Sequence, residues 1–246
     1  MLDHLQPGHL LCLDIETVPG EASFHLLPDE LKELYLRKSE RLKSAGETME
    51  EQYFQHAGIY AEFGKVICIS VGLFIKEKET GEWAFRIKSM YGDDEKKVLL
   101  EFSALLQHYP PSKHFQFCGH NIREFDVPYL CRRMLIQGIP LPSMLDISGK
   151  KPYEVFMVDT MQLWRFGDYK HFTSLRLLAA LFNIPSPKDD IEGKDVGRVY
   201  WTDKDLRRIV EYCQKDVVTV AQLILRFKGM PLIKPENIHV VDGAVS

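Results

Sequence analysis

The sequence predicts an α/β fold that forms a single domain. Short apolar runs typical of strands alternate with longer segments whose apolar residues recur at helical spacing. The 246 residues are 45% hydrophobic and 27% charged, which is ordinary globular composition and enough chain to fill a core. The sequence contains no repeat, low-complexity segment or clear linker. We therefore expect one domain over residues 1–246.

The N-terminal part supplies three expected strands. The run LLCLDIETV (10–18) is predicted to be a buried strand. The β-rich runs at 64–75 and 82–92 are separated by a charged turn that ends in glycine, so we expect them to form a hairpin beside the first strand. Residues 28–56 show helical spacing, which predicts a helical insertion over about 20–60.

The middle of the chain alternates between helix and strand. Residues 93–109 begin with acids suited to a helix N-terminus and continue at helical period. A short strand is expected at 114–121 and a helix, stopped by glycine, at 127–138. The segment 154–166 is predicted to run as a strand to Val158 and then as a helix.

A long helix is expected in the C-terminal part of the chain. Residues 202–227 are predicted to be helical, with Thr202 as the cap and acids in the first turn. A helix over 173–184, capped by Thr173, precedes it, and residues 185–201 have the composition of a loop. We expect the tail at about 229–246 to be weakly structured.

Composition and charge limit the function classes. A net charge of −4 argues against a protein that wraps nucleic acid, but not against an enzyme that grips a few phosphates. The five cysteines have no paired metal spacing and are expected to be reduced, buried fillers. No apolar run is long enough to span a bilayer, and the N-terminus lacks the pattern of a signal peptide, so we expect a cytoplasmic protein.

Two acids interrupt the first apolar strand. Asp14 and Glu16 are two residues apart, so they project from the same face of that strand. Burying two neighbouring carboxylates without a partner is costly. Hard oxygen ligands suit Mg²⁺ or Mn²⁺, and no nearby His or Cys set favours zinc. The pair therefore predicts a site for a divalent cation.

Two further segments each carry an acid that is a candidate site residue. In GHNIREFDVPYL, an apolar strand ends at glycine and a helix is expected to start after Asp126, although Asp126 also fits a helix cap and Asn121 also fits a turn. In EYCQKDVVTV, Tyr212 and Asp216 are four residues apart and share a helix face. An ion pair of Asp216 with Arg208 or Lys215 is the structural alternative.

Taken together in this order, the three segments resemble the motifs of the DEDD exonuclease superfamily. The stretch DIET is similar to the first motif, NIREFD to the second and YCQKD to the third. A tyrosine four residues before the last aspartate is the mark of the DEDDy branch; the histidine branch has histidine five before it, where this chain has Glu211. The second motif, GHNIREFDVPYL, resembles the corresponding motif of the proofreading exonuclease domain of B-family DNA polymerases. The chain resembles predicted stand-alone bacterial exonucleases related to that domain. The resemblance covers about residues 10–227.

This resemblance implies a ribonuclease H-like fold and a 3′–5′ exonuclease that acts on DNA with two Mg²⁺ or Mn²⁺ ions. It implies that Asp14, Glu16, Asp126 and Asp216 bind the metal ions. Two ions can activate a water and neutralise the leaving 3′ oxygen during phosphodiester hydrolysis. Tyr212 would position the attacking water or a phosphate oxygen, since a free tyrosine titrates far above neutrality. The same comparison suggests that Asp159 is a structural acid near the site, outside the catalytic four.

Contacts with the strand are predicted at four positions, Thr17, Asn121, Phe125 and Arg208. Phe125 could stack on the last base, although a core position fits it as well. Arg208 precedes Tyr212 by one helical turn and could reach backbone phosphates. Further basic candidates, which also fit solvated surface charge, are Lys150, Lys151, Lys170 and His171.

Three alternatives stay open at the level of sequence. A 3′–5′ exoribonuclease of the same branch fits, since nothing in the motifs reads the 2′ hydroxyl. A catalytically silent nucleic-acid or protein-binding module would also keep the fold, although the four carboxylates and the tyrosine are retained. Finally, the chain could proofread for a polymerase that lies elsewhere. No membrane partner is expected.

Overall fold

The structure, a computed structural model, describes residues 2, 4–40, 46–78, 80–109, 115–168, 170, 172–185 and 191–241. In this part of the chain, six strands form one mixed sheet in the order β5-β4-β1-β2-β3-β6. The strands are β1 (Leu10–Pro19), β2 (Gly64–Lys76), β3 (Trp83–Tyr91), β4 (Gln116–Gly119), β5 (Met157–Asp159) and β6 (Ile238–Val240). β1 pairs antiparallel with β2 and parallel with β4, so the strand that carries Asp14 and Glu16 is central.

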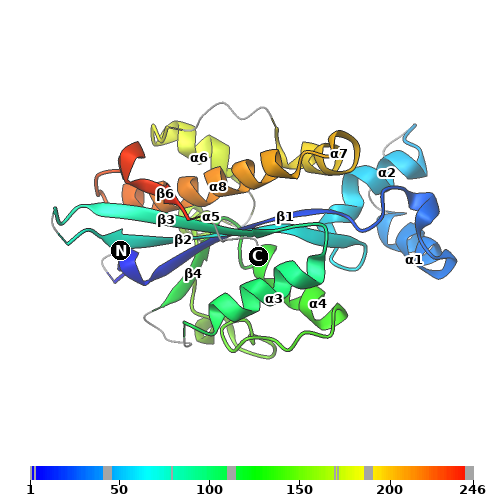
Figure 1. The fold of residues 1–246 in the computed structure, drawn as a ribbon, viewed down its shortest axis with the longest axis horizontal. Helices are drawn as coiled ribbons and strands as arrows, with labels where there is room; N and C mark the ends of the chain where they lie inside the picture. The colour runs from blue at the N-terminus through cyan, green and yellow to red at the C-terminus, as the bar shows by residue number, and fades with distance from the viewer. Residues whose placement is uncertain are drawn as a thin grey trace.

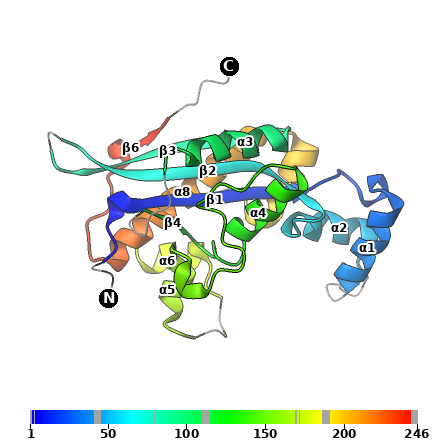
Figure 2. The same cartoon turned by 90° about the horizontal axis from the view of Figure 1, so that it is seen from below.

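Helices cover both faces of this sheet (Figure 1). They are α1 (Asp29–Ser39), α2 (Met49–His56), α3 (Glu95–Leu106), α4 (Asp126–Ile136), α5 (Thr160–Arg165), α6 (Leu175–Leu181), α7 (Val196–Arg198) and α8 (Leu206–Phe227). α6, α7 and α8 lie on one face, and α3 and α4 lie on the other. The view from below shows α1 and α2 beyond the carboxyl end of β1 (Figure 2).

The alternation of side chains along β1 divides the core into two layers. Leu11, Leu13 and Ile15 are buried with residues of α3 and α4, whereas Leu10 and Cys12 are buried with residues of α8. Successive residues of a strand point to opposite faces, so Asp14 and Glu16 continue the row that faces α8. The prediction of a buried strand over this run is confirmed.

The predicted helical insertion forms two helices, α1 and α2. α1 ends at Ser39, Gly46 has a left-handed φ of 89°, and α2 starts after Thr48. The Thr48 side chain accepts a hydrogen bond from the Glu51 amide while Glu51 bonds back to Thr48, which is a capping box that starts a new helix. The left-handed Gly46 and the capping box at Thr48 mark the start of α2. The spacing of apolar residues gives no sign of this boundary.

The predicted cap of the 173–184 helix is wrong by one residue. α6 begins after Ser174, whose side chain accepts a hydrogen bond from the Leu177 amide. The Thr173 carbonyl oxygen instead lies 2.9 Å from Nε2 of His120. A tertiary contact therefore holds Thr173 outside the helix.

The segment 185–201 was expected to be a loop, but residues 191–201 are mostly helical. A short turn leads into α7 and then into a π-helical turn, η7 (Val199–Asp203). Val199 and Tyr200 are buried in this segment, which is why it folds back onto the sheet. Residues 186–190 lie outside the described residues.

The start of the long helix also differs from the prediction. Thr202 belongs to η7, and Lys204 has a left-handed φ of 56° that ends this turn. α8 begins after Asp205, whose side chain accepts a hydrogen bond from the Arg208 amide, and its first turn contains no acid. The remaining length of the predicted helix, to Phe227, is confirmed.

The tail contains a strand that the sequence pattern did not predict. β6 pairs parallel with β3 through Ile238, His239 and Val240 at the edge of the sheet. With three residues and partly exposed side chains, this strand has little pattern of its own. The predicted hairpin is confirmed, because β2 and β3 pair antiparallel from Cys68 and Tyr91 to Lys76 and Trp83.

Candidate active site

Asp14 and Glu16 lie on β1 under the N-terminal half of α8. Glu16 is only 7% exposed, and Asp14 is partly exposed. The pairing of β1 with β2 shifts register between Glu16 and Thr17, which is a β-bulge beside the two acids. Bulges redirect side chains and are common next to active sites.

α8 brings a second group of side chains to these acids. Cys213 Sγ lies 3.3 Å from Asp14 Oδ2 and 3.5 Å from the Asp14 carbonyl oxygen. Ligand atoms of Asp14, Glu16 and Cys213 all lie within 4.8 Å of one another, close enough to surround one cation. Asp216 follows Cys213 by three residues, so both side chains lie on the same face of α8.

Cys213 was not predicted as part of this group. The cysteine was expected to be an apolar filler, and it is indeed buried and free. Its position directly after Tyr212 and three residues before Asp216 is a helical-face signal that could have found it. Burial raises the pKa of the Cys213 thiol, and a contact with Cys68 raises it further. The thiol therefore stays protonated and donates its hydrogen to Asp14.

Asp126 reaches the group from the other side of β1. Its Oδ1 accepts a hydrogen bond of 3.2 Å from the backbone amide of Ile15, the residue between the two acids of β1. The side chain is buried, and the N-cap position of α4 is held by Phe125 without a side-chain hydrogen bond. The alternative in which Asp126 serves as a helix cap is therefore excluded, since its carboxylate faces β1.

Asp159 positions the loop that leads to Asp126. This buried carboxylate accepts hydrogen bonds from the amides of Asn121 and Arg123, at 3.1 and 3.2 Å. It also caps α5 by accepting from the amides of Met161 and Gln162. With four backbone donors already satisfied, Asp159 has the contacts of a structural acid.

The carboxylates repel one another electrostatically. Burial raises the pKa of Asp14 well above its usual range, and the charges of Asp216 and then Asp126 raise it further. Burial likewise raises the pKa of Glu16, with Asp14 as the next cause. Burial raises the pKa of Asp126 to about 7. The donor set is dominated by hard oxygen atoms with excess negative charge, which fits a divalent cation such as Mg²⁺ or Mn²⁺.

Tyr212 lies beside these acids on α8. Burial raises the pKa of its hydroxyl above the usual range, followed in effect by the charges of Asp216 and Glu16. The hydroxyl also hydrogen-bonds the Asp216 side chain. It is therefore protonated at neutral pH and can donate a hydrogen bond, but cannot act as a base.

The four predicted substrate contacts lie in different settings. The hydroxyl of Thr17 donates to the carbonyl oxygen of Gly58 at 2.8 Å, and the strand alternation directs it away from the face with Asp14 and Glu16. Asn121 has a left-handed φ of 64°, and its carbonyl accepts from the amide of Phe125, so it forms the turn before α4. Thr17 and Asn121 are thus held by structural contacts, and their substrate roles stay predictions.

Phe125 and Arg208 are partly buried near the site. The Phe125 ring packs on Tyr129 at a centroid distance of 5.5 Å and against the core on the α3–α4 face. Arg208 Nη1 lies 3.9 Å from Asp203 Oδ2. Lys150, Lys151 and Lys170 are exposed, and His171 lies outside the described residues.

A basic recess on the α8 side of the sheet was missed by sequence reasoning. It has a volume of about 400 Å³ and is lined by Lys65, Asp93, Tyr200, Trp201, Lys204 and Leu206. Both lysines lie over the Trp201 ring, with Nζ 4.7 Å (Lys65) and 5.0 Å (Lys204) from its centre. These residues come from distant segments, so no local sequence signal could have assembled them.

Two comparisons with known proteins gave a match, one to a family and one to a fold. Residues 59–232 match the model of a family described as predicted 3′–5′ exonucleases related to the exonuclease domain of PolB. The chain is similar in fold to the family B DNA polymerase from the hyperthermophilic archaeon Pyrobaculum calidifontis, with a TM-score of 0.51 and 22% identity over 91% of this chain. It spans about a quarter (24%) of that polymerase chain. The predicted ribonuclease H-like fold is confirmed by this match.

No curated protein matches the chain. Within the described residues, no helix combines the length and the apolar character needed to cross a membrane.

Proposed function

The chain belongs to the family of predicted 3′–5′ exonucleases related to the exonuclease domain of PolB, and we propose that it releases 5′ mononucleotides from the 3′ end of single-stranded DNA. The observation that carries this proposal is the convergence of four carboxylates from three distant segments. Asp14 and Glu16 come from β1, Asp126 from the start of α4 and Asp216 from α8, and each of the other acids influences the pKa of Glu16.

Asp14, Glu16, Asp126 and Asp216 would hold two Mg²⁺ or Mn²⁺ ions. When bound, such ions lower the pKa of a coordinated water and stabilise charge on the leaving 3′ oxygen. The raised pKa values of Asp14 and Glu16 support this role, because burial and the neighbouring acids disfavour their negative charge and a bound cation would relieve that repulsion.

The chain's own groups orient these acids and the substrate. The Ile15 amide holds Asp126 in place, and the Cys213 thiol holds Asp14. The protonated Tyr212 hydroxyl would donate a hydrogen bond to the attacking water or to a nonbridging phosphate oxygen. Together these contacts would fix the reacting groups before hydrolysis begins, which reduces the entropic barrier.

The test is digestion of 3′-end and 5′-end labelled single-stranded DNA, duplex DNA and RNA, with Mg²⁺, Mn²⁺ or a chelator in parallel. We expect metal-dependent shortening of single-stranded DNA from its 3′ end, with 5′ mononucleotides as products. Asp216→Ala, purified in the same way, controls for contaminating nucleases. A preference for RNA would identify an exoribonuclease, and undiminished activity in excess chelator would overturn the proposal.

A further inference from the structure

Two phenylalanine rings stand out from the surface in the segment that follows α5. Phe166 is 74% exposed and Phe172 is 71% exposed, although large apolar side chains are usually at least half covered. Neither contributes to the proposed chemistry.

Two contacts fasten this segment to the loop that carries Asp126. His120 Nε2 lies 2.9 Å from the carbonyl oxygen of Thr173, the residue after Phe172. Arg165, the residue before Phe166, places Nη1 3.5 Å from Oε1 of Glu124. Arg165 and Thr173, which flank the two exposed rings in the sequence, therefore both contact residues 120–124. These residues shortly precede the candidate metal ligand Asp126.

A buried cation supports one of the rings. The guanidinium of Arg165 lies 4.5 Å from the centre of the Phe172 ring, although Arg165 itself is only 8% exposed. Its Nε has no hydrogen-bond partner among the described residues. A cation beneath an aromatic face fixes the orientation of the ring and leaves the outer face free for stacking.

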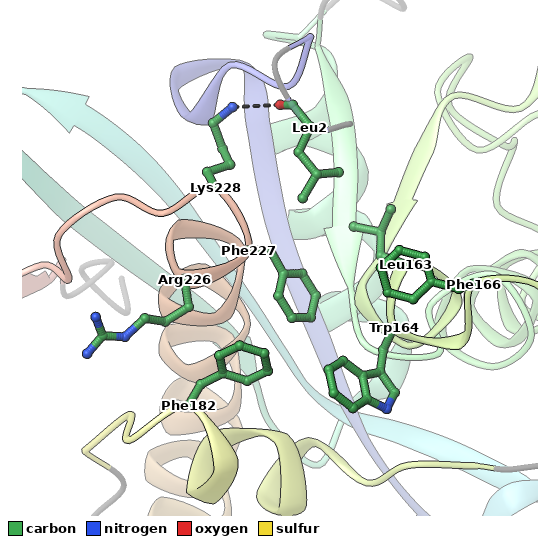
Figure 3. Close-up of a pocket in the computed structure, with 8 residues that line it drawn as sticks. All are labelled: Leu2, Leu163, Trp164, Phe166, Phe182, Arg226, Phe227 and Lys228. Carbon is green, nitrogen blue, oxygen red and sulfur yellow. Dashed lines mark hydrogen bonds between the residues drawn. The ribbon is translucent and has the colours of Figure 1, made fainter.

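The other ring stands at the edge of a cavity. Phe166 has a left-handed φ of 47°, which is rare for a bulky residue and is tolerated where surrounding contacts impose it. The cavity has a volume of about 450 Å³, and Figure 3 shows Phe166 and Leu163 on one side of it and Phe227 on the other. The outward-turned ring thus borders a largely apolar space, also lined by Arg226 and Lys228, that is large enough for a planar base.

We propose that Phe166 and Phe172 form a stacking surface for unpaired bases of the strand whose 3′ end lies at the carboxylate cluster. This inference rests on the proposed exonuclease function. Aromatic faces bind bases with little sequence preference, as an enzyme that shortens a strand one nucleotide at a time requires. Duplex DNA cannot offer unpaired bases, so the surface selects single strands.

The first test measures binding of a fluorescently labelled single-stranded oligonucleotide by anisotropy, in an Asp216→Ala background that prevents digestion. Removing a stacking ring should raise the Kd about 5- to 150-fold in Phe166→Ala and in Phe172→Ala. Phe172→Trp should keep parental affinity, since it retains an aromatic face. Tyr153→Ala is the matched control, because Tyr153 is 70% exposed but belongs neither to the cavity lining nor to the segment that carries Phe166 and Phe172.

A direct signature of stacking comes from the fluorescent base 2-aminopurine placed within the oligonucleotide. Its emission should be quenched in the parent complex and recover in the complex with Phe172→Ala. Equal Kd values for the parent and both alanine variants would overturn the proposal, as would unchanged quenching. Thermal melting of each variant confirms that these exposed substitutions leave the fold intact.

The second test separates the stacking surface from the chemistry. With active protein, Phe172→Ala should raise KM for a single-stranded oligonucleotide and leave hydrolysis of the p-nitrophenyl ester of thymidine 5′-monophosphate unchanged, since this small substrate has no neighbouring base. Equal losses on both substrates would overturn the stacking role. If the parent hydrolyses neither substrate, the proposed exonuclease function fails, and the binding test still decides the surface independently.

Discussion

The thiol of Cys213 lies 3.3 Å from Oδ2 of Asp14, although 199 positions separate the two residues in the chain. The thiol donates a hydrogen bond to a carboxylate whose pKa is raised by burial and by the charges of Asp216 and Asp126. This contact links α8 to β1 at the point where the candidate metal ligands meet.

Replacing Cys213 should therefore affect the metal site without removing a carboxylate. Cys213→Ala loses the donor to Asp14, and we expect single-turnover hydrolysis to slow about tenfold, in line with the value of a hydrogen bond to a charged group. Cys213→Ser keeps a donor and should stay within about threefold of the parent. Parental rates in Cys213→Ala would show that Asp14 is oriented by other contacts.

The carboxylate cluster should destabilise the metal-free protein. Asp14→Asn relieves like-charge repulsion, so the free energy of unfolding without metal should rise by about 1 kcal/mol, while activity is lost. Mg²⁺ or Mn²⁺ should raise the melting temperature of the parent by mass action. Calorimetry with and without chelator measures both effects. A metal-free variant that melts below the metal-free parent would mean that Asp14 is paired favourably.

The raised pKa of Asp126 should make the stability of the protein depend on pH. Burial raises its pKa from 3.8 to about 7, so between these values the native state binds more protons than the unfolded state. The free energy of unfolding contributed by this group is therefore greatest at low pH and declines as pH rises. With chelator present, lowering the pH from about 8 to about 6 should increase the contribution of Asp126 to the free energy of unfolding by about 1 kcal/mol.

Urea titrations of parent and Asp126→Asn across this range provide the measurement. The difference between the two proteins reports Asp126 and the acids coupled to it. It cancels the titration of groups outside this cluster, including His120, whose pKa is lowered by burial and whose effect has the opposite sign. Asp29→Asn is the control, because Asp29 is an exposed acid on α1. Identical pH slopes in parent and Asp126→Asn would contradict the prediction.

Tyr212 and Asp216 share a face of α8 but should have different roles. Asp216→Ala removes a proposed metal ligand, which should cost several kcal/mol of transition-state stabilisation and leave almost no turnover. Tyr212→Phe keeps the ring and loses the hydroxyl, so turnover should slow by about 10² with little change in metal or DNA affinity.

Single-turnover hydrolysis and metal titration by calorimetry, applied to both variants, distinguish the two roles. A parental rate in Tyr212→Phe would make the tyrosine a packing residue. Loss of metal affinity in Tyr212→Phe would show that the hydroxyl supports Asp216 in binding the cation.

Local periodicity predicted the elements that carry the candidate site. The alternation along β1 was sufficient to place Asp14 and Glu16 on one face, and the four-residue spacing in α8 placed Tyr212 over Asp216. These predictions succeed because the periods of strand and helix are properties of the backbone, independent of the rest of the chain.

Contacts between distant segments could not be obtained in the same way. Three hydrogen bonds depend on the order and register of the strands. They join the Ile15 amide to Asp126, the Cys213 thiol to Asp14, and His120 to the Thr173 carbonyl oxygen. The local sequence around Asp126 and Thr173 fits a helix cap at each position. In the structure neither residue caps a helix, and each accepts a hydrogen bond from a residue distant in the sequence. Local propensities are worth about 1 kcal/mol per residue, so a single buried tertiary contact is enough to override them.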